Sequence, residues 1–280
     1  MADDLAAVLA NHTVRWPGTA AVGVVSARGV EAVTGPVERV APWASVTKLV
    51  VALACLVATE EGTVALDDYA GPPGATLAHL LAHASGLPFE GHQPISPPGR
   101  RRIYSNTGTE MAAEHLESRA GMTIGAYLDA GVLGPLGMAG TVLTGSAAHS
   151  AQGPLVDLLA LAAELLSPTL IGPATHAAAV TPAWPDLAGV VPGFGRQDPC
   201  PWGLGPEVRG AKTPHWTGAR NSPATYGHFG QSGSFLWVDP LPGLAMVALS
   251  GAAFGPWAGQ EWPLLADAVL AHWSDGGGPA

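Results

Sequence analysis

The sequence predicts an α/β fold of the α+β type, with an antiparallel β-sheet that both ends of the chain form and helices that flank it. Two observations support this prediction: β-rich apolar runs stand near both ends of the chain, and helix signals dominate its middle. The 280 residues are 48% hydrophobic and 12% charged, which is typical of a globular protein. We expect residues 1–65 and 200–280 to form the sheet domain, and residues 66–199 to form an inserted, mostly helical domain.

The first part of the chain predicts a helix, a β-hairpin and a second, apolar helix. Acidic residues suit the first turn of the first helix, a Gly-containing turn joins the two strands, and Gly62 suits the end of the second helix. The predicted elements are a helix over Asp3–Asn11, strands over Ala21–Ser26 and Val30–Val33, and a helix from Ser45 to about Glu60–Gly62.

The middle of the chain carries successive helix start and stop signals. Thr76 suits an N-cap, Thr107 and Glu110 fit a capping box, and Gly121 suits a C-cap. The predicted helices cover Thr76–Ala84, Thr107–Gly121, Thr123–Val132 and Pro154–Leu166, while residues 168–200 carry no assignable pattern.

Strand signals return after residue 200. Short extended pieces are indicated weakly at 202–204 and 207–209, because Gly205-Pro206 separates them. Clearer strands follow at Tyr226–Gly230, Phe235–Val238 and Leu244–Ser250, and a last helix covers about Gln260–Trp273.

The formal net charge of −10 argues against a nucleic-acid partner and against docking on anionic lipid. The N-terminal segment carries acidic residues where a signal peptide needs basic ones, and no apolar run reaches the roughly 20 residues that a membrane span needs. We therefore expect a cytoplasmic protein. Cys55 and Cys200 could form one disulfide, but nothing in the sequence indicates an oxidising compartment.

Ser45 and Lys48 lie three residues apart where a turn leads into the apolar run 49–58, and the chain has only one other lysine, Lys212. Residues at this spacing on a helix share a face, which brings an amine within reach of a hydroxyl. An amine in apolar surroundings has a lowered pKa and can accept a proton, as the base beside a nucleophilic serine must. The simpler alternative is an N-cap serine beside an unrelated lysine.

Two further segments could contribute to the same chemistry. Tyr104 and Asn106 stand two apart at a turn, where a phenol could move a proton and a carboxamide could hold a substrate amide. The glycine-rich segment from His228 to Ser234 could let a substrate approach the backbone and offer N–H groups to an oxyanion. Taken separately, the first segment is better explained by turn chemistry, and the second by a glycine-rich bend with a surface histidine.

Other features favour a structural role. His79 and His83 have metal-ligand spacing, but no third ligand is evident, so helix packing and capping is the better interpretation. The triplet Arg100–Arg102 fits a solvated loop, with recognition of an anionic substrate as the alternative. Trp202 and Trp216 could line an acyl pocket, although packing against the sheet is the simpler expectation.

The order of the three segments resembles the motif set of penicillin-recognising serine hydrolases, that is, the β-lactamase and penicillin-binding-protein-like family. The tyrosine form of the second motif is similar to class C β-lactamases, family VIII carboxylesterases and D-aminopeptidases. The resemblance runs from about residue 20 to 251 and rests on Ser45-Val-Thr-Lys48, Tyr104-Ser-Asn106, His228-Phe-Gly230, Leu80–Leu87, Pro98-Gly99 and Gly134–Met138.

The resemblance implies roles for these residues. Ser45 would be the acylated nucleophile, Lys48 and Tyr104 would share proton transfer in an order left open, and Asn106 would contact the acyl side of the substrate. The backbone N–H groups of Ser45 and Gln231 would form the oxyanion hole.

We also expect Gly230 and Ser232 to lie at the substrate. His228 stands where β-lactamases have the lysine of Lys-Thr-Gly. Because histidine is mostly neutral at pH 7, it is a weaker anchor for a penicillin carboxylate.

We therefore expect a serine hydrolase of the β-lactamase/transpeptidase-like fold that acts through an acyl-enzyme on an ester or amide of a small molecule, without metal or organic cofactor. The alternatives are a β-lactamase, a D-amino-acid peptidase or an acyltransferase. A non-catalytic binding protein on the same fold is disfavoured, because a binding protein needs no base beside its serine. The sequence leaves the oligomeric state open.

Overall fold

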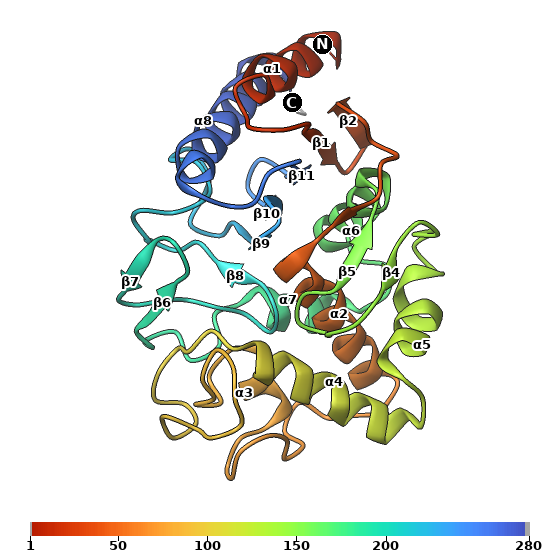
Figure 1. Cartoon of the computed structure of the whole chain (residues 1–280), viewed down its shortest axis with the longest axis vertical. Helices are drawn as coiled ribbons and strands as arrows, with labels where there is room; N and C mark the ends of the chain where they lie inside the picture. The colour runs from red at the N-terminus through yellow and green to blue at the C-terminus, as the bar shows by residue number, and fades with distance from the viewer. Residues whose placement is uncertain (1, 278–280) are drawn as a thin grey trace.

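The computed structural model describes residues 2–277 and has a single large antiparallel sheet at its centre (Figure 1). The strand order is β2-β1-β11-β10-β9-β8, so strands from the two ends of the chain pair side by side, as the sequence predicts. The strands of this sheet are β1 (Ala21–Ser26), β2 (Gly29–Thr34), β8 (Glu207–Val208), β9 (Tyr226–Gly230), β10 (Ser234–Asp239) and β11 (Leu244–Leu249).

Both faces of the sheet are covered by helices. Every residue of β1, β10 and β11 is buried, because successive side chains point to opposite faces and each face meets an apolar layer. Helices α1 (Ala2–Thr13) and α8 (Pro256–His272) pack on one face, and α6 (Leu155–Leu166) packs on the other (Figure 1). The mixed architecture, with its antiparallel sheet and flanking helices, confirms the predicted fold class.

Helix α6 approaches the sheet closely at Gly23 of β1. A Cβ atom at position 23 would lie 2.9 Å from Cδ2 of Leu159, so any larger residue would require the Leu159 side chain to shift. Although α6 packs on the sheet, it falls within residues 66–199, which we expect to form the helical domain; the domain boundaries stay a prediction.

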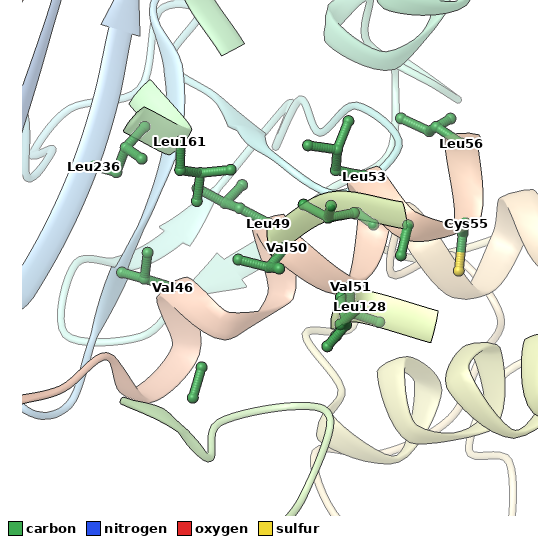
Figure 2. Packing of buried hydrophobic residues seen from close by; sticks show 14 of the residues in the cluster. Val46, Leu49, Val50, Val51, Leu53, Cys55, Leu56, Leu128, Leu161 and Leu236 are labelled. Carbon is green, nitrogen blue, oxygen red and sulfur yellow. The ribbon is translucent and has the colours of Figure 1, made fainter. Parts of the chain in front are cut away.

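Helix α2 (Thr47–Glu60) connects the sheet to the helical part of the molecule. Its residues 47–58 are all buried, which explains why it is apolar on every side rather than amphipathic. Figure 2 shows Leu161 of α6 and Leu236 of β10 near its first turn, and Leu128 of α5 beside Val51, all members of one core cluster. Cys55 on the same helix is a buried free thiol, as is Cys200.

The remaining helices form the far side of the molecule from α1 and α8 (Figure 1). Two small sheets accompany them: β3-β5-β4 lies beside the start of α2, and the hairpin β6-β7 lies in the segment 168–200 that the sequence left unassigned. These elements are α3 (Leu77–Leu81), α4 (Asn106–Ala120), α5 (Ile124–Leu128), α7 (Pro173–Val180), β3 (Ala41–Pro42), β4 (Val142–Leu143), β5 (Ala151–Gly153), β6 (Gly189–Val191) and β7 (Gly195–Gln197).

Three predicted helix boundaries need correction. The helix expected from Ser45 begins at Thr47, and Ser45 itself lies in a 3-10 turn, Ala44–Val46. Helix α3 ends at Leu81, because His83 adopts a left-handed conformation with φ 53°. Helix α4 is capped by Ser105 rather than by a box at Thr107, since the Ser105 hydroxyl accepts the N–H of Gly108 at 2.9 Å.

Within residues 2–277, none of the helices combines the length and the hydropathy that crossing a lipid bilayer requires.

Candidate active site

The turn that carries Ser45 is held from two sides. The N–H of Trp43 donates to the carbonyl of Ala151 on β5 at 2.9 Å, and the Trp43 carbonyl accepts the hydroxyl of Ser234 on β10 at 2.7 Å. Ala44 then takes a left-handed φ of 45°, which is costly for a residue with a Cβ and persists because Trp43 before it is anchored on both sides. The position of the Ser45 side chain is therefore set by the surrounding strands.

Strand β9 ends against this turn and needs a glycine there. A Cβ at position 230 would lie 2.5 Å from the Trp43 carbonyl oxygen and 3.0 Å from the Cβ of Ala44. Gly230 thus brings the end of β9, with Gln231 after it, next to Ser45.

Lys48 lies one turn after Ser45 and is 2% exposed. Its Nζ atom is 3.3 Å from Oγ of Ser45, 2.7 Å from Oδ1 of Asn106 and 2.9 Å from the carbonyl oxygen of Ala148. Burial lowers the pKa of Lys48 to about 7, although the nearby carboxylate of Glu110 opposes the shift. A substantial fraction of the amine is therefore neutral at physiological pH.

The partners of Lys48 also orient the neutral amine. An uncharged amine has two N–H groups and one lone pair, and the oxygens of Asn106 and Ala148 can accept both N–H groups. The lone pair is then left for the remaining neighbour, the hydroxyl of Ser45. This geometry suits removal of the Ser45 proton.

Asn106 orients Lys48, and each of its two side-chain groups already has one hydrogen-bond partner. Its Oδ1 atom accepts from Lys48, and its Nδ2 group donates to Glu90 Oε1 at 2.7 Å, which fixes the direction of the amide. Glu90 and the Ala148 carbonyl have no sequence signal as site residues, because both come close to Lys48 only through the fold.

Tyr104 lines the same cavity as Ser45. Its ring stands 4.8 Å from Nζ of Lys48 and packs against aromatic rings of His83 at 4.8 Å and Trp202 at 5.8 Å. Burial raises the pKa of Tyr104 above its ordinary value, so the phenol keeps its proton at neutral pH. Tyr104 is consequently suited to donate a proton.

His228 on β9 is buried, with its ring centre 5.6 Å from that of Tyr104. Its Nδ1 lies 2.7 Å from the carbonyl oxygen of Phe229, and its Nε2 has no hydrogen-bond partner within the part of the chain that the structure describes. Burial lowers the pKa of His228 to about 3, and the charge of Lys48 acts in the same direction. His228 is therefore uncharged at neutral pH.

Ser45 opens into a cavity of about 310 Å³. Trp202 forms part of its wall, contrary to the packing role expected for it, whereas Trp216 packs on Phe229 and Phe235 as expected. The cavity is mainly apolar and is lined by Ser45, Phe89, Tyr104, Val191, Pro192, Trp202, His228, Phe229 and Gln231.

The other predicted site residue, Ser232, lies to one side of this cavity. Its hydroxyl is 3.0 Å from that of Ser234, and it is not among the residues that line the cavity around Ser45.

A buried ion pair supports the wall that Trp202 forms. Nζ of Lys212 lies 2.8 Å from Oε1 of Glu207 and 5.8 Å from the centre of the Trp202 ring. Burial alone would raise the pKa of Glu207, but the charges of Lys212 and His215 hold it well below its ordinary range. The second lysine of the chain is thus structural, and no pattern in the sequence predicts its pairing with Glu207.

His79 and His83 have separate roles in the structure. His79 accepts the N–H of Thr76 at 3.2 Å in the cap of α3 and packs against the Trp184 ring, while Nδ1 of His83 accepts the N–H of Ser105 at 3.2 Å. No cluster of three or more potential metal ligands occurs within residues 2–277.

Comparison with known proteins gives matches over nearly the whole chain. The family model described as Beta-lactamase matches residues 6–271. A crystal structure described as a β-lactamase from Mycobacterium bovis is 47% identical, with a TM-score of 0.93 over 98% of this chain and 99% of that one. A search of curated proteins gives no match.

Two more distant structures share the fold. Simvastatin synthase from Aspergillus terreus is 16% identical, with a TM-score of 0.80 over 98% of this chain and 100% of that one. EstCE1, described as a hydrolase with promiscuous acyltransferase activity, is 17% identical, with a TM-score of 0.80 over 96% of this chain and 99% of that one.

The environment of Lys48 predicts a distinctive titration. In protein labelled with ¹³C at the lysine Cε, NMR should show two signals, from Lys48 and Lys212, and one should titrate with a pKa of about 7. The variant Lys48→Arg should lack the titrating signal. If neither signal moved between about pH 5.5 and 9, the amine of Lys48 would not be the neutral group that the geometry requires.

Proposed function

The chain belongs to the β-lactamase family of hydrolases, and from this premise we propose that it is a serine hydrolase forming an acyl-enzyme at Ser45. The observation that carries the proposal is the buried amine of Lys48, whose two hydrogen-bond acceptors leave its lone pair for the Ser45 hydroxyl. A binding protein would gain nothing from this costly burial of an amine.

The first half of the reaction follows from the protonation states of Lys48, which can be neutral, and Tyr104, which keeps its proton. Lys48 takes the proton of Ser45 while Oγ bonds to the substrate carbonyl carbon, and Tyr104 donates its phenolic proton to the departing alkoxide or amine. Transfer of the captured proton from Lys48 to Tyr104 restores both groups and leaves the acyl chain on Ser45. We thus assign the base to Lys48 and the acid to Tyr104.

In the second half Lys48 again acts as the base. Water bonds to the acyl carbon and loses a proton to Lys48, and Oγ of Ser45 leaves and takes that proton back. An amine or alcohol in place of water would give acyl transfer. The backbone N–H groups of Ser45 and Gln231 are our candidates for the oxyanion hole, because Gln231 lines the cavity and follows Gly230, which touches the Ser45 turn.

The cavity around Ser45 favours an ester or amide of a small molecule with an uncharged reacting end. Among the described residues that line it, none is a lysine or arginine, and His228 is neutral, so a penicillin carboxylate has no cationic anchor on β9. The proposed chemistry uses no metal and no organic cofactor. The cytoplasmic location stays a prediction from the sequence.

Mass spectrometry after incubation with an activated ester, and in parallel with a fluorescent penicillin, tests the nucleophile. The wild-type protein should gain one acyl group on Ser45 from the ester. The variant Ser45→Ala should gain none and should lose at least about 10³-fold in ester turnover.

Ser118→Ala, which removes an exposed hydroxyl from α4, is the matched control and should behave as wild type. Unchanged hydrolysis by Ser45→Ala would refute the proposal. A penicillin adduct that forms and clears quickly would make the protein a β-lactamase instead.

The role of Tyr104 as the acid predicts a dependence on the leaving group. Tyr104→Phe should slow hydrolysis of an alkyl ester by about 10²-fold or more, because an alkoxide needs a proton to leave. A nitrophenyl ester with the same acyl group should be affected much less, since nitrophenolate leaves unprotonated. Equal losses in kcat/KM for both esters would show that Tyr104 does not act as the acid.

A further inference from the structure

A second, larger cavity adjoins the one around Ser45. Its volume is about 690 Å³, against about 310 Å³ for the first. Phe89, Tyr104 and Pro192 line both cavities, so the two are neighbouring parts of one depression. A substrate that reaches Ser45 could therefore extend past Tyr104 into the larger cavity.

The larger cavity concentrates positive charge in an acidic protein. Arg100, Arg101, Arg102 and Arg196 line it, which is four of the ten arginines in a chain with a formal net charge of −10. No aspartate or glutamate is among the described residues of its lining. This concentration of charge favours an anionic occupant.

The four arginines differ in what already neutralises them. Arg196 pairs with Asp198 at 2.9 Å. Arg102 is buried and donates to backbone carbonyls, including that of Cys200 at 3.1 Å. Arg100 and Arg101 are exposed, and the structure records no hydrogen bond or ion pair for either side chain within residues 2–277. Two guanidinium groups at the cavity are thus available to a ligand.

The segment that carries these arginines is anchored to the rest of the fold by hydrogen bonds. The N–H of Arg102 donates to the carbonyl of Ala188 at 2.9 Å, which joins the arginine segment to the β6-β7 hairpin. Gly189 permits this contact, because a Cβ there would lie 2.6 Å from the carbonyl oxygen of Arg102. The guanidinium of Arg102 adds bonds to the carbonyls of Ala82 and Ala183. A solvated loop, the simpler interpretation of the triplet, would not need this anchoring.

Large apolar side chains stand exposed beside the free arginines. Phe89, Ile95 and Val190 are 52%, 62% and 56% exposed, and all three line the cavity. Apolar surface of this kind beside unpaired cations fits a ligand that is apolar along its body and anionic at one end.

We propose that this cavity binds the anionic, partly apolar end of the substrate. Arg100 and Arg101 hold its carboxylate or phosphate, and Phe89, Ile95 and Val190 contact the apolar segment that leads toward Ser45. The inference rests on the proposed function for the reacting end of the substrate. It places recognition of negative charge beside the helical part of the molecule rather than on β9, where His228 is neutral.

The test measures binding separately from catalysis. Isothermal titration calorimetry of the Ser45→Ala variant with octyl phosphate, octanoate and octanol compares a phosphate, a carboxylate and a neutral group on the same chain. At least one anion should bind about tenfold more tightly than octanol. The double variant Arg100→Gln/Arg101→Gln, in the same Ser45→Ala background, should lose that advantage and keep its affinity for octanol.

The matched control is Arg119→Gln/Arg220→Gln, which removes two exposed arginines that do not line the cavity. In the Ser45→Ala background this control changes the net charge by the same amount as Arg100→Gln/Arg101→Gln. It should bind all three ligands as Ser45→Ala alone does. The proposal is overturned if octanol binds as tightly as both anions, if no ligand binds, or if the two double variants lose the same affinity. Which anion binds more tightly decides between carboxylate and phosphate.

The outcome is independent of the proposed reaction. If Ser45→Ala retained ester hydrolysis, the reaction assigned to Ser45 would fail while the binding result stood. If hydrolysis were lost but neither anion bound preferentially, the reaction would stand and the anion site would fail.

Discussion

The structure depends on keeping the amine of Lys48 out of water. Helix α2 is apolar on all sides because it runs between the sheet and the helical region, and Lys48 enters this interior one turn after Ser45. Burying an amine is costly, and the fold offsets the cost with oxygen atoms from separate elements: Asn106 at the start of α4 and Ala148 ahead of β5. The same burial that disfavours the charge makes the amine a base.

One physical cause sets the protonation of three groups. Burial lowers the pKa of Lys48 and His228 and raises that of Tyr104, so each moves toward its neutral form. The cavity around Ser45 thereby becomes a place for proton transfer without a fixed cation for substrate binding. The unpaired positive charges, those of Arg100 and Arg101, lie in the adjoining cavity. We propose that chemistry and charge recognition are divided between these two adjoining cavities.

The sequence predicted those elements that a local pattern of apolar residues and turn residues determines. The long strands and α6 follow from apolar runs and turn signals. The order of the three motifs also predicted that Ser45 and His228, which are 183 positions apart, belong to one site, and both line the same cavity. Strands of two or three residues, such as β3 and β5, have no period to detect, and they are what places Ala148 beside Lys48. The sequence predicts Asn106 as a substrate contact, and only the fold reveals that Glu90 lies close enough to accept one N–H of its amide.

The central claim is that Lys48, neutral because it is buried, removes the proton of Ser45. The most direct measurement is the rate constant for acylation of Ser45 by an activated ester in a single turnover, followed from about pH 5 to 9. The account predicts that the rate rises with pH and levels off, with an apparent pKa of about 7, as Lys48 loses its proton. A rate independent of pH over this range, or one still rising toward the ordinary lysine pKa of about 10.4, would contradict it.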